Sequence, residues 1–371
     1  MSPITSFKAL ARDTCGQVLS RLGLTAPEAR LHQRLSIITF HRVLTEPQRQ
    51  LYPLPGLAVT PDELDAHLKF ATRHFRCLSL NSALDLWGQD RYAGPPILAI
   101  TFDDGQLDNY QNALPVLERN GVTASFYIPS QTLENTAPLW HDAMATSVAW
   151  LTAHLTHPTV LPDPSQRKGA VELLADLHPG GDLERTAGHT TVEAALEATK
   201  RWSPAQREDW MLRAQTLLPC PVRHSWDGFM TVEQMKDLIA RGHEIGSHSH
   251  SHALLPQCTA DELQAEIAGS KLKLESALGT PITTFCYPNG STDQRSVALV
   301  REAGYRAAVT TQWGSNAREA GLYTLQRFNM NAKHAQDRRG RFSEARLAWR
   351  MSGWHPGLTG TKQDPYGRAS A

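Results

Sequence analysis

Residues 97 to 105 read ILAITFDDG, in which six residues typical of a buried strand lead into two aspartates and a glycine. The same order recurs along the chain, where a helix-like segment ends at a glycine and a short β-rich run follows. The pairs are LPVLERNG with VTASFYIPS, MKDLIARG with HEIGSHSHSH, KLKLESALG with TPITTFCYPNG, and VALVREAG with YRAAVTTQWG. Strands that alternate with helices at this spacing favour parallel pairing with right-handed crossovers. The sequence therefore predicts an α/β fold, and in a barrel of such units functional side chains gather where the strands end.

The alternation stops between about residues 131 and 223. This part has helical periodicity broken by LPDPSQRKG and HPGGD, so it predicts a helical insertion. We expect three parts, namely an N-terminal helical segment at 1–35, a main domain at 36–330 that carries the insertion, and a C-terminal extension at 331–371. The last residues, GLTGTKQDPYGRASA, are polar and poor in apolar side chains, so we expect the extension to be partly disordered.

Composition limits the classes of partner. The 371 residues are 41% hydrophobic, enough for one large core or two ordinary ones. Lys+Arg and Asp+Glu both number 37, so no net field attracts nucleic acid or an anionic membrane, and we expect no nucleic-acid partner. The start of the sequence has no apolar stretch of signal-peptide type, and no apolar run is long enough to span a membrane. Five cysteines without a CxxC pair suit a reducing compartment, so we expect a cytoplasmic protein.

The paired aspartates of ILAITFDDG have two interpretations. Asp103 and Asp104 would point to opposite sides of an extended chain, but Gly105 allows a turn that brings both to a shared site. Like charges would repel there unless a cation or hydrogen bonds intervened. Alternatively, the aspartates cap the following helix-like segment, QLDNYQNALPVLERNG, because Asp is a favoured N-cap residue.

A second cluster, GHEIGSHSHSHALL, follows its own short strand. His248 and His252 are four residues apart, a spacing that places two imidazoles on one face of a helical turn, whereas His250 lies off that face. Imidazoles with a carboxylate are the ligands expected for zinc or a neighbouring divalent transition metal. The alternative is that these are ordinary surface or core histidines in a loop that is histidine-rich by chance.

Together, TFDDG and GHEIGSHSHSH resemble the polysaccharide deacetylase family, the NodB-homology carbohydrate esterases. The resemblance covers roughly residues 36 to 330 and implies a distorted, incomplete (β/α) barrel with the helical segment as an insertion. It implies that Asp103 is the catalytic base and that Asp104, His248 and His252 hold the metal. The implied ion is Zn²⁺, with Co²⁺, Ni²⁺ or Mn²⁺ as alternatives.

The stretch FCYPNG is similar to a strand-end motif of the family that shapes the substrate groove and supplies a backbone N–H for the oxyanion. The resemblance implies substrate binding by Tyr287, Pro288 and Asn289, although they could be ordinary turn and packing residues. The chain departs from the pattern, because many members have arginine where Cys286 stands and tyrosine where Asn289 stands. Arg327, in LYTLQRFNM, could substitute for the missing arginine partner of the base.

The stretch SIITFHRVL resembles one that opens a subset of these enzymes, in which its histidine is the general acid. The resemblance therefore implies that His41 is the acid, and a core or surface histidine is the alternative. His334, in NMNAKHAQD, is the second candidate, because other members place this histidine late in the chain.

The implied activity is metal-dependent hydrolysis of N-acetyl groups on an amino-sugar-containing saccharide or polysaccharide precursor, with release of acetate. An O-acetyl esterase and an inactive carbohydrate-binding relative are the alternatives, although an inactive relative would be expected to lack the base or a ligand. A zinc peptidase would carry HExxH, whereas Glu244 precedes His248 here, and a glycosidase would need no histidine turn. The expected partners are an acetylated saccharide substrate and enzymes of polysaccharide biosynthesis.

Overall fold

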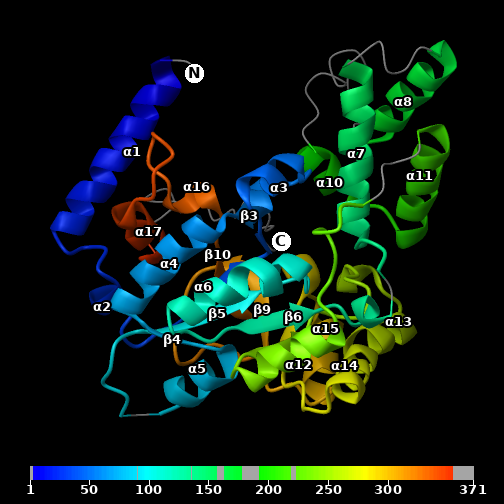
Figure 1. Cartoon of the computed structure of the whole chain (residues 1–371). Helices are drawn as coiled ribbons and strands as arrows, with labels where there is room; N and C mark the ends of the chain where they lie inside the picture. The colour runs from blue at the N-terminus through cyan, green and yellow to red at the C-terminus, as the bar shows by residue number, and fades with distance from the viewer. Residues whose placement is uncertain are drawn as a thin grey trace. The chain divides into compact units, whose positions relative to one another are not determined.

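The computed structural model describes most of the chain (Figure 1). The described ranges are 3–89, 91–134, 136–156, 163–177, 192–218 and 223–353. Within them no helix is both long and apolar enough to cross a membrane. The polar stretch GLTGTKQDPYGRASA, for which partial disorder is expected, lies outside the described residues.

The chain divides into two compact units. The first contains residues 1–46, 56–136 and 228–371, and the second contains residues 47–55 and 137–227. The first unit holds the β-sheets, and the second is built from helices. The three-part division expected from the sequence stays a prediction.

Seven parallel strands form a closed ring in the described part of the first unit. In ring order they are β1 (Leu35–Phe40), β10 (Leu325–Asn329), β9 (Ala307–Trp313), β8 (Thr284–Cys286), β7 (Glu244–Ser247), β6 (Ser125–Ile128) and β5 (Ile97–Phe102). The ring closes where β1 pairs with β5 from Leu35↔Ile97 to Phe40↔Phe102. Another strand, β4 (Arg76–Leu78), pairs with the first half of β5. The expected fold class, a distorted (β/α) barrel short of eight units, is confirmed.

Helices surround the strands of this barrel (Figure 1). They include α4 (Pro61–His74), α5 (Leu80–Trp87), α6 (Leu114–Arg119), α12 (Val232–Ala240), α14 (Ser270–Leu278) and α15 (Gln294–Glu302). Other elements of this unit are α1 (Pro3–Arg21), α2 (Pro27–Arg30), α13 (Ala260–Gln264), α16 (Ala332–Ala335), α17 (Glu344–Met351), β2 (Arg42–Val43) and β3 (Ala58–Val59). The single turns are η1 (Pro55–Leu57), η3 (Ser130–Leu133), η4 (Leu255–Gln257) and η6 (Pro288–Gly290), which are 3₁₀, and η2 (Asn109–Ala113) and η5 (Ala265–Gly269), which are π-helical.

Strand alternation decides which side chains enter the barrel. Along β5, Ile100 and Phe102 belong to the large core cluster, whereas Ala99 belongs to a second cluster that joins residues of β1, β9 and β10 to α5. Because side chains of a strand alternate between faces, Thr101 and then Asp103 share the inward side of Ala99. The Asp103 N–H donates to the Phe40 carbonyl at 3.0 Å, so the strand pairing continues to this residue. The fold thus directs the first aspartate of DDG into the barrel.

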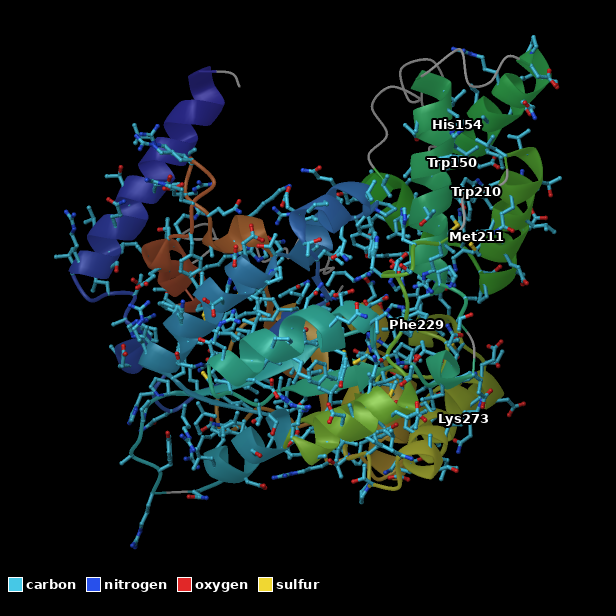
Figure 2. All side chains as sticks on the ribbon, viewed as in Figure 1. Trp150, His154, Trp210, Met211, Phe229 and Lys273 are labelled. Carbon is cyan, nitrogen blue, oxygen red and sulfur yellow. The ribbon has the colours of Figure 1, made fainter. Side chains whose placement is uncertain are left out.

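The second unit contains α7 (Trp140–Thr156), α8 (Pro164–Asp176), α10 (Val192–Thr199) and α11 (Pro204–Leu217), and α3 (Glu46–Leu51) lies mostly within it. Its core includes Met144, Leu173 and Trp210, and the Trp210 indole N–H donates to the Leu173 carbonyl at 2.9 Å. Trp150 and His154, one turn apart on α7, are labelled with Trp210 in Figure 2, and their rings lie 4.0 Å apart. Helices thus replace the strand–helix alternation here, as the sequence predicts for the insertion.

Candidate active site

The DDG loop turns sharply after β5. Asp104 has φ 74° and Gly105 has φ 66°, so two consecutive residues adopt the left-handed conformation. This conformation is uncommon for a residue other than glycine and marks a constrained position. It directs the Asp104 side chain toward the end of β7, where its Oδ1 lies 3.4 Å from Nε2 of His248 and 3.4 Å from Nε2 of His252.

The two histidines meet without a helical turn. Ser249 (φ 65°) and His252 (φ 58°) are left-handed, so the expectation that the pair stacks on one face of a helix is wrong. The His252 N–H instead donates to the Ser249 hydroxyl at 3.1 Å, a local bond that competes with helix formation. The imidazole rings still lie 4.7 Å apart at 85°, because the irregular turn brings the second histidine back beside the first.

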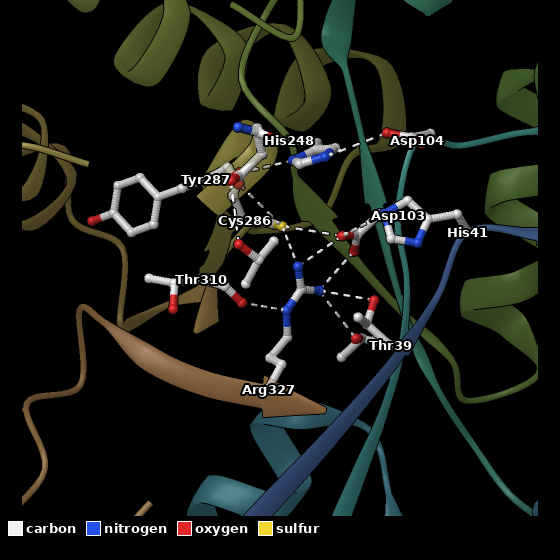
Figure 3. A network of polar contacts seen from close by, with 12 residues as sticks. Thr39, His41, Asp103, Asp104, His248, Cys286, Tyr287, Thr310 and Arg327 are labelled. Carbon is white, nitrogen blue, oxygen red and sulfur yellow. Dashed lines mark hydrogen bonds and ion pairs between the residues drawn. The ribbon is translucent and has the colours of Figure 1, made fainter. Parts of the chain in front are cut away.

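These three side chains fit a divalent metal. The ligand atoms of Asp104, His248 and His252 lie within 4.8 Å of one another, and all three residues are buried. Nδ1 of His248 donates to the Cys286 carbonyl at 2.8 Å, which fixes the ring so that its Nε2 faces Asp104 (Figure 3). Burial lowers the pKa of His248, but its hydrogen bonds to Asp104 and to the Cys286 carbonyl, together with the charge of Asp103, outweigh this and raise the pKa well above its ordinary value. The cluster therefore attracts positive charge, and two nitrogens with one carboxylate suit zinc or a similar ion.

Asp103 forms a buried ion pair with Arg327 of β10 (Figure 3). The guanidinium donates from Nη1 to Oδ1 at 2.8 Å and from Nη2 to Oδ2 at 2.7 Å, a bidentate arrangement. Burial alone would raise the pKa of Asp103, but the charge and hydrogen bonds of Arg327 lower it to about 2. Asp103 is therefore ionised at neutral pH. It also does not cap the next helix, because both its oxygens face Arg327 and the Leu107 N–H donates to the Gly228 carbonyl.

Arg327 is held from several sides inside the barrel. Its Nε donates to the Thr310 carbonyl at 2.8 Å, and its Nη1 donates to the hydroxyls of Thr39 and Thr101 at 3.0 and 3.3 Å. Its Nη2 lies 3.2 Å from the Cys286 sulfur. Burial raises the pKa of Cys286, so a neutral thiol packs against the cation. The structure thus brings Arg327 to Asp103, the aspartate for which the sequence suggested it as a substitute partner. The functional role of Arg327 stays a prediction.

His41 and His334 occupy different surroundings. His41 follows β1, and its Nε2 lies 3.9 Å from Oδ2 of Asp103, with 15% of the side chain exposed. The His334 ring packs edge-on against Trp313 at 5.4 Å. The main chain at His41 is fixed by the Asn109 amide, which donates to its carbonyl at 2.9 Å. His41 is thus the candidate acid that lies beside the candidate base, and both assignments stay predictions.

The FCYPNG motif forms a tight turn after β8. Tyr287 is fully buried, its ring packs on Phe285 at 5.2 Å, and its N–H donates to the Val309 carbonyl. Pro288 is also buried, whereas Asn289 is half-buried and left-handed, with φ 55°. The Tyr287 side chain belongs to the core, so the structure does not place it on a substrate surface. Substrate binding by these three residues stays a prediction.

Sequence reasoning missed the residues that support the two loops. Met230 donates its N–H to the Gly105 carbonyl at 3.0 Å, so a segment more than a hundred residues away pairs with the DDG loop. Figure 2 labels its neighbour Phe229, which forms an isolated bridge with Gln106. Glu266 accepts hydrogen bonds from the turn between His248 and His252. In the sequence, these residues resemble ordinary loop and helix-surface positions, and no local signal distinguishes them.

The sequence profile of the polysaccharide deacetylase family matches residues 90–168 and 200–308, about half of the chain. The chain therefore belongs to the polysaccharide deacetylase family, whose name implies hydrolysis of acetyl groups.

Individual relatives agree with this assignment. YxkH of Bacillus subtilis (strain 168), which carries the name of a polysaccharide deacetylase, is 22% identical over 277 residues, or 74% of this chain and 67% of YxkH. The Streptococcus pyogenes deacetylase PplD, solved with acetate, superposes with a TM-score of 0.54 at 16% identity, over 86% of this chain and 98% of its own. IcaB from Ammonifex degensii gives 0.52 at 14% identity, over 85% and 97%. At these identities the two structures show a shared fold.

Proposed function

We propose that this chain is a metal-dependent deacetylase that removes N-acetyl groups from an amino-sugar-containing saccharide or polysaccharide precursor and releases acetate. The observation that carries the proposal is the division between adjacent aspartates. Asp103 is paired with Arg327, and Asp104 faces two imidazole nitrogens at 3.4 Å each. One carboxylate is thus suited to handle a proton and the other to hold a cation.

Asp104, His248 and His252 would hold the ion, most simply Zn²⁺, with Co²⁺, Ni²⁺ or Mn²⁺ also compatible with the donor set. When bound, such an ion supplies a Lewis acid that polarises the acetyl carbonyl and makes a water more acidic. Asp103 then accepts the proton of the attacking water, because Arg327 keeps its carboxylate ionised at neutral pH. The same ion pair fixes the orientation of that carboxylate, so a single geometry is presented to the water.

Cleavage of the amide also requires a proton for the departing nitrogen. His41 is positioned to donate it, because its Nε2 lies 3.9 Å from Asp103 and its side chain is partly exposed. The alcohol oxygen of an ester leaves without protonation more readily than the nitrogen of an amide. A histidine at this position therefore favours N-deacetylation over O-deacetylation. We also propose that the turn formed by Tyr287, Pro288 and Asn289 borders the bound substrate.

The balanced charge of the chain supports a saccharide partner rather than nucleic acid. The scattered cysteines support a cytoplasmic setting, and the four described ones are free thiols. Such a setting favours an unexported precursor as substrate and an association with enzymes of polysaccharide biosynthesis.

The decisive experiment measures acetate release from a panel of N-acetylated and O-acetylated saccharides. The metal is first removed with a chelator, and Zn²⁺, Co²⁺, Ni²⁺ and Mn²⁺ are then added back separately. We expect chelation to abolish release from N-acetyl substrates and at least one ion to restore it. Full activity in a rigorously metal-free preparation would contradict the proposal, and exclusive activity on O-acetyl groups would replace it with the esterase alternative.

A further inference from the structure

Glu266 is a buried carboxylate in the π-helical turn η5, with 7% of its surface exposed. Its Oε2 accepts from the N–H groups of His250 and Ser251, each at 2.9 Å. Its Oε1 accepts from the Ser251 hydroxyl at 2.5 Å. One side chain thus binds two consecutive peptide units of another segment, and those units lie between His248 and His252.

The 248–252 turn depends on other segments, because the N–H groups of His250 and Ser251 donate to Glu266 and not to an acceptor in the turn. It contains two left-handed residues, Ser249 and His252, and such conformations are unfavourable for residues other than glycine and persist only where the surroundings impose them. Partly buried N–H groups left without acceptors would add a further cost. The two oxygens of one carboxylate can together accept all three hydrogen bonds of this turn. Glu266 is therefore well suited to hold the turn in its strained form.

The turn is also fixed on its other side. The Ser130 and Gln131 N–H groups donate to the carbonyls of Ser249 and His250 at 3.0 Å each. Segment η3 thus binds the carbonyl groups of the turn while Glu266 binds its N–H groups. Both attachments therefore act on the backbone that joins the two histidines.

The turn that carries Glu266, η5, is π-helical, and so is η2, which follows the DDG loop. In η2, Asn109 donates to the carbonyl of His41, and the preceding Asp108 accepts the Val43 N–H at 2.6 Å. π-helical turns are rare and frequently occur at functional sites. In this barrel each of the two places a polar side chain against the backbone of a loop that carries a site residue.

We propose that Glu266 is a positioning residue for the metal site, which holds the 248–252 turn so that both imidazole nitrogens face Asp104 before an ion binds. This inference rests on the proposed function in one respect, namely that these residues hold a metal. It goes beyond that function in assigning the geometry of the site to a carboxylate that touches neither metal nor substrate.

The test compares Glu266→Ala with Glu244→Ala. Glu244, at the start of β7, also accepts three hydrogen bonds, from the hydroxyls of Ser79 and Ser125 and the N–H of Asn81, but it does not contact the turn. Both substitutions remove a carboxylate with matched bonding, so a general loss of stability affects both. The measurements are the Zn²⁺ and Co²⁺ dissociation constants by competition with a chromophoric chelator, the Co²⁺ absorption spectrum and the Tm of the metal-free chain.

We expect Glu266→Ala to weaken metal affinity by about 10- to 100-fold and to change the Co²⁺ spectrum, as loss of supporting hydrogen bonds does at other metal sites. Glu244→Ala should lower Tm and leave affinity within about twofold of the unaltered chain. Equal affinity losses in the two variants would overturn the inference.

Two further variants apply if Glu266→Ala does not fold. The Glu266→Gln side chain keeps its length, so its amide oxygen can still accept both N–H groups, and affinity should be largely retained. The Glu266→Asp side chain keeps the charge but is one methylene shorter, so affinity should fall. An Asp variant that binds metal as tightly as the unaltered chain would show that the reach of Glu266 does not position the turn.

The outcomes also separate this inference from the proposed function. An unaltered chain that binds metal but releases no acetate contradicts the proposed function alone. An active chain whose Glu266 variants all bind metal normally contradicts the inference alone.

Discussion

The two ends of strand β7 hold charged side chains in different ways. At its start, the Glu244 carboxylate accepts from two hydroxyls and one N–H, all of them neutral donors. Beyond its end, His248 faces Asp104 across 3.4 Å, and Asp103 is matched by the full charge of Arg327. Neutral donors complete the bonding of a carboxylate and tie segments together. Opposed imidazoles and carboxylates create a strong preference for a cation, so the first end is organised for stability and the second for chemistry.

We expect the largest losses of activity from substitutions beyond the C-terminal end of β7. His248→Ala and His252→Ala should abolish activity because each removes a proposed metal ligand, and metal content measured after dialysis should fall with it. Asp103→Asn should retain the metal and lose turnover by about 10³-fold, because a general base contributes about 10²- to 10⁴-fold.

The control for this comparison is Glu244→Gln at the other end of β7, which should affect neither metal content nor turnover. Equal metal loss in the Asp103 and histidine variants would show that Asp103 is also a ligand, and the division between the aspartates would then be incorrect.

Removal of Arg327, the cation paired with Asp103, should cause a large loss of stability. Arg327→Met leaves a buried carboxylate without its partner, which costs about 3–5 kcal/mol of unfolding free energy. Urea unfolding measures this loss. The double variant Asp103→Asn/Arg327→Met should recover part of it, because no buried charge remains, and strictly additive losses would indicate that the two residues do not interact.

A smaller effect is expected at His41. If it protonates the leaving nitrogen, His41→Ala should slow an N-acetyl sugar by about 10²-fold while an activated acetate ester, whose leaving group departs as an anion, is slowed far less. Metal content should not change. The same selective loss in His334→Ala would transfer the role to that residue, and equal losses on both substrates would indicate a positioning or folding role.

The smallest expected effect is a pH-dependent loss of stability at a histidine that lies at neither end of β7. His67 of α4 packs against Phe40, and burial lowers its pKa to about 4, only partly offset by its hydrogen bond to the Glu63 carbonyl. The unfolded chain, with a histidine pKa of 6.5, takes up this proton first, so the contribution of His67 to stability is complete above pH 6.5 and is lost as pH falls toward 4.

Between pH 7 and about pH 5 this loss amounts to about 2 kcal/mol of unfolding free energy. Urea unfolding of the unaltered chain and of His67→Leu at both pH values measures it. The substituted chain should lose less stability on acidification, and identical pH dependence would show that His67 is not held neutral. The result would contrast a histidine neutralised by burial with His248, whose pKa Asp104 and Cys286 raise.

Local sequence was sufficient for the strand-end residues. ILAITF predicts a buried strand, so the position of DDG at the end of a barrel strand followed from the pattern, whereas only the structure showed that Asp103 is the aspartate that points inward. The spacing of His248 and His252 likewise indicated a shared site. The pattern did not reveal that the turn between them is left-handed at Ser249 and His252, because hydrogen bonds from other segments impose that conformation.

By itself, the sequence determined the α/β class, the candidate ligands and base, and the family to which the chain belongs, because short motifs encode strand ends and donor sets locally. Tertiary structure alone decided the closure of the ring between β1 and β5, the bidentate contact of Arg327 with Asp103, and the hold of Glu266 on the histidine turn. The physical reason is that each of these joins groups distant in the chain. Buried charges and strained turns depend on partners that only the folded barrel brings within hydrogen-bonding distance.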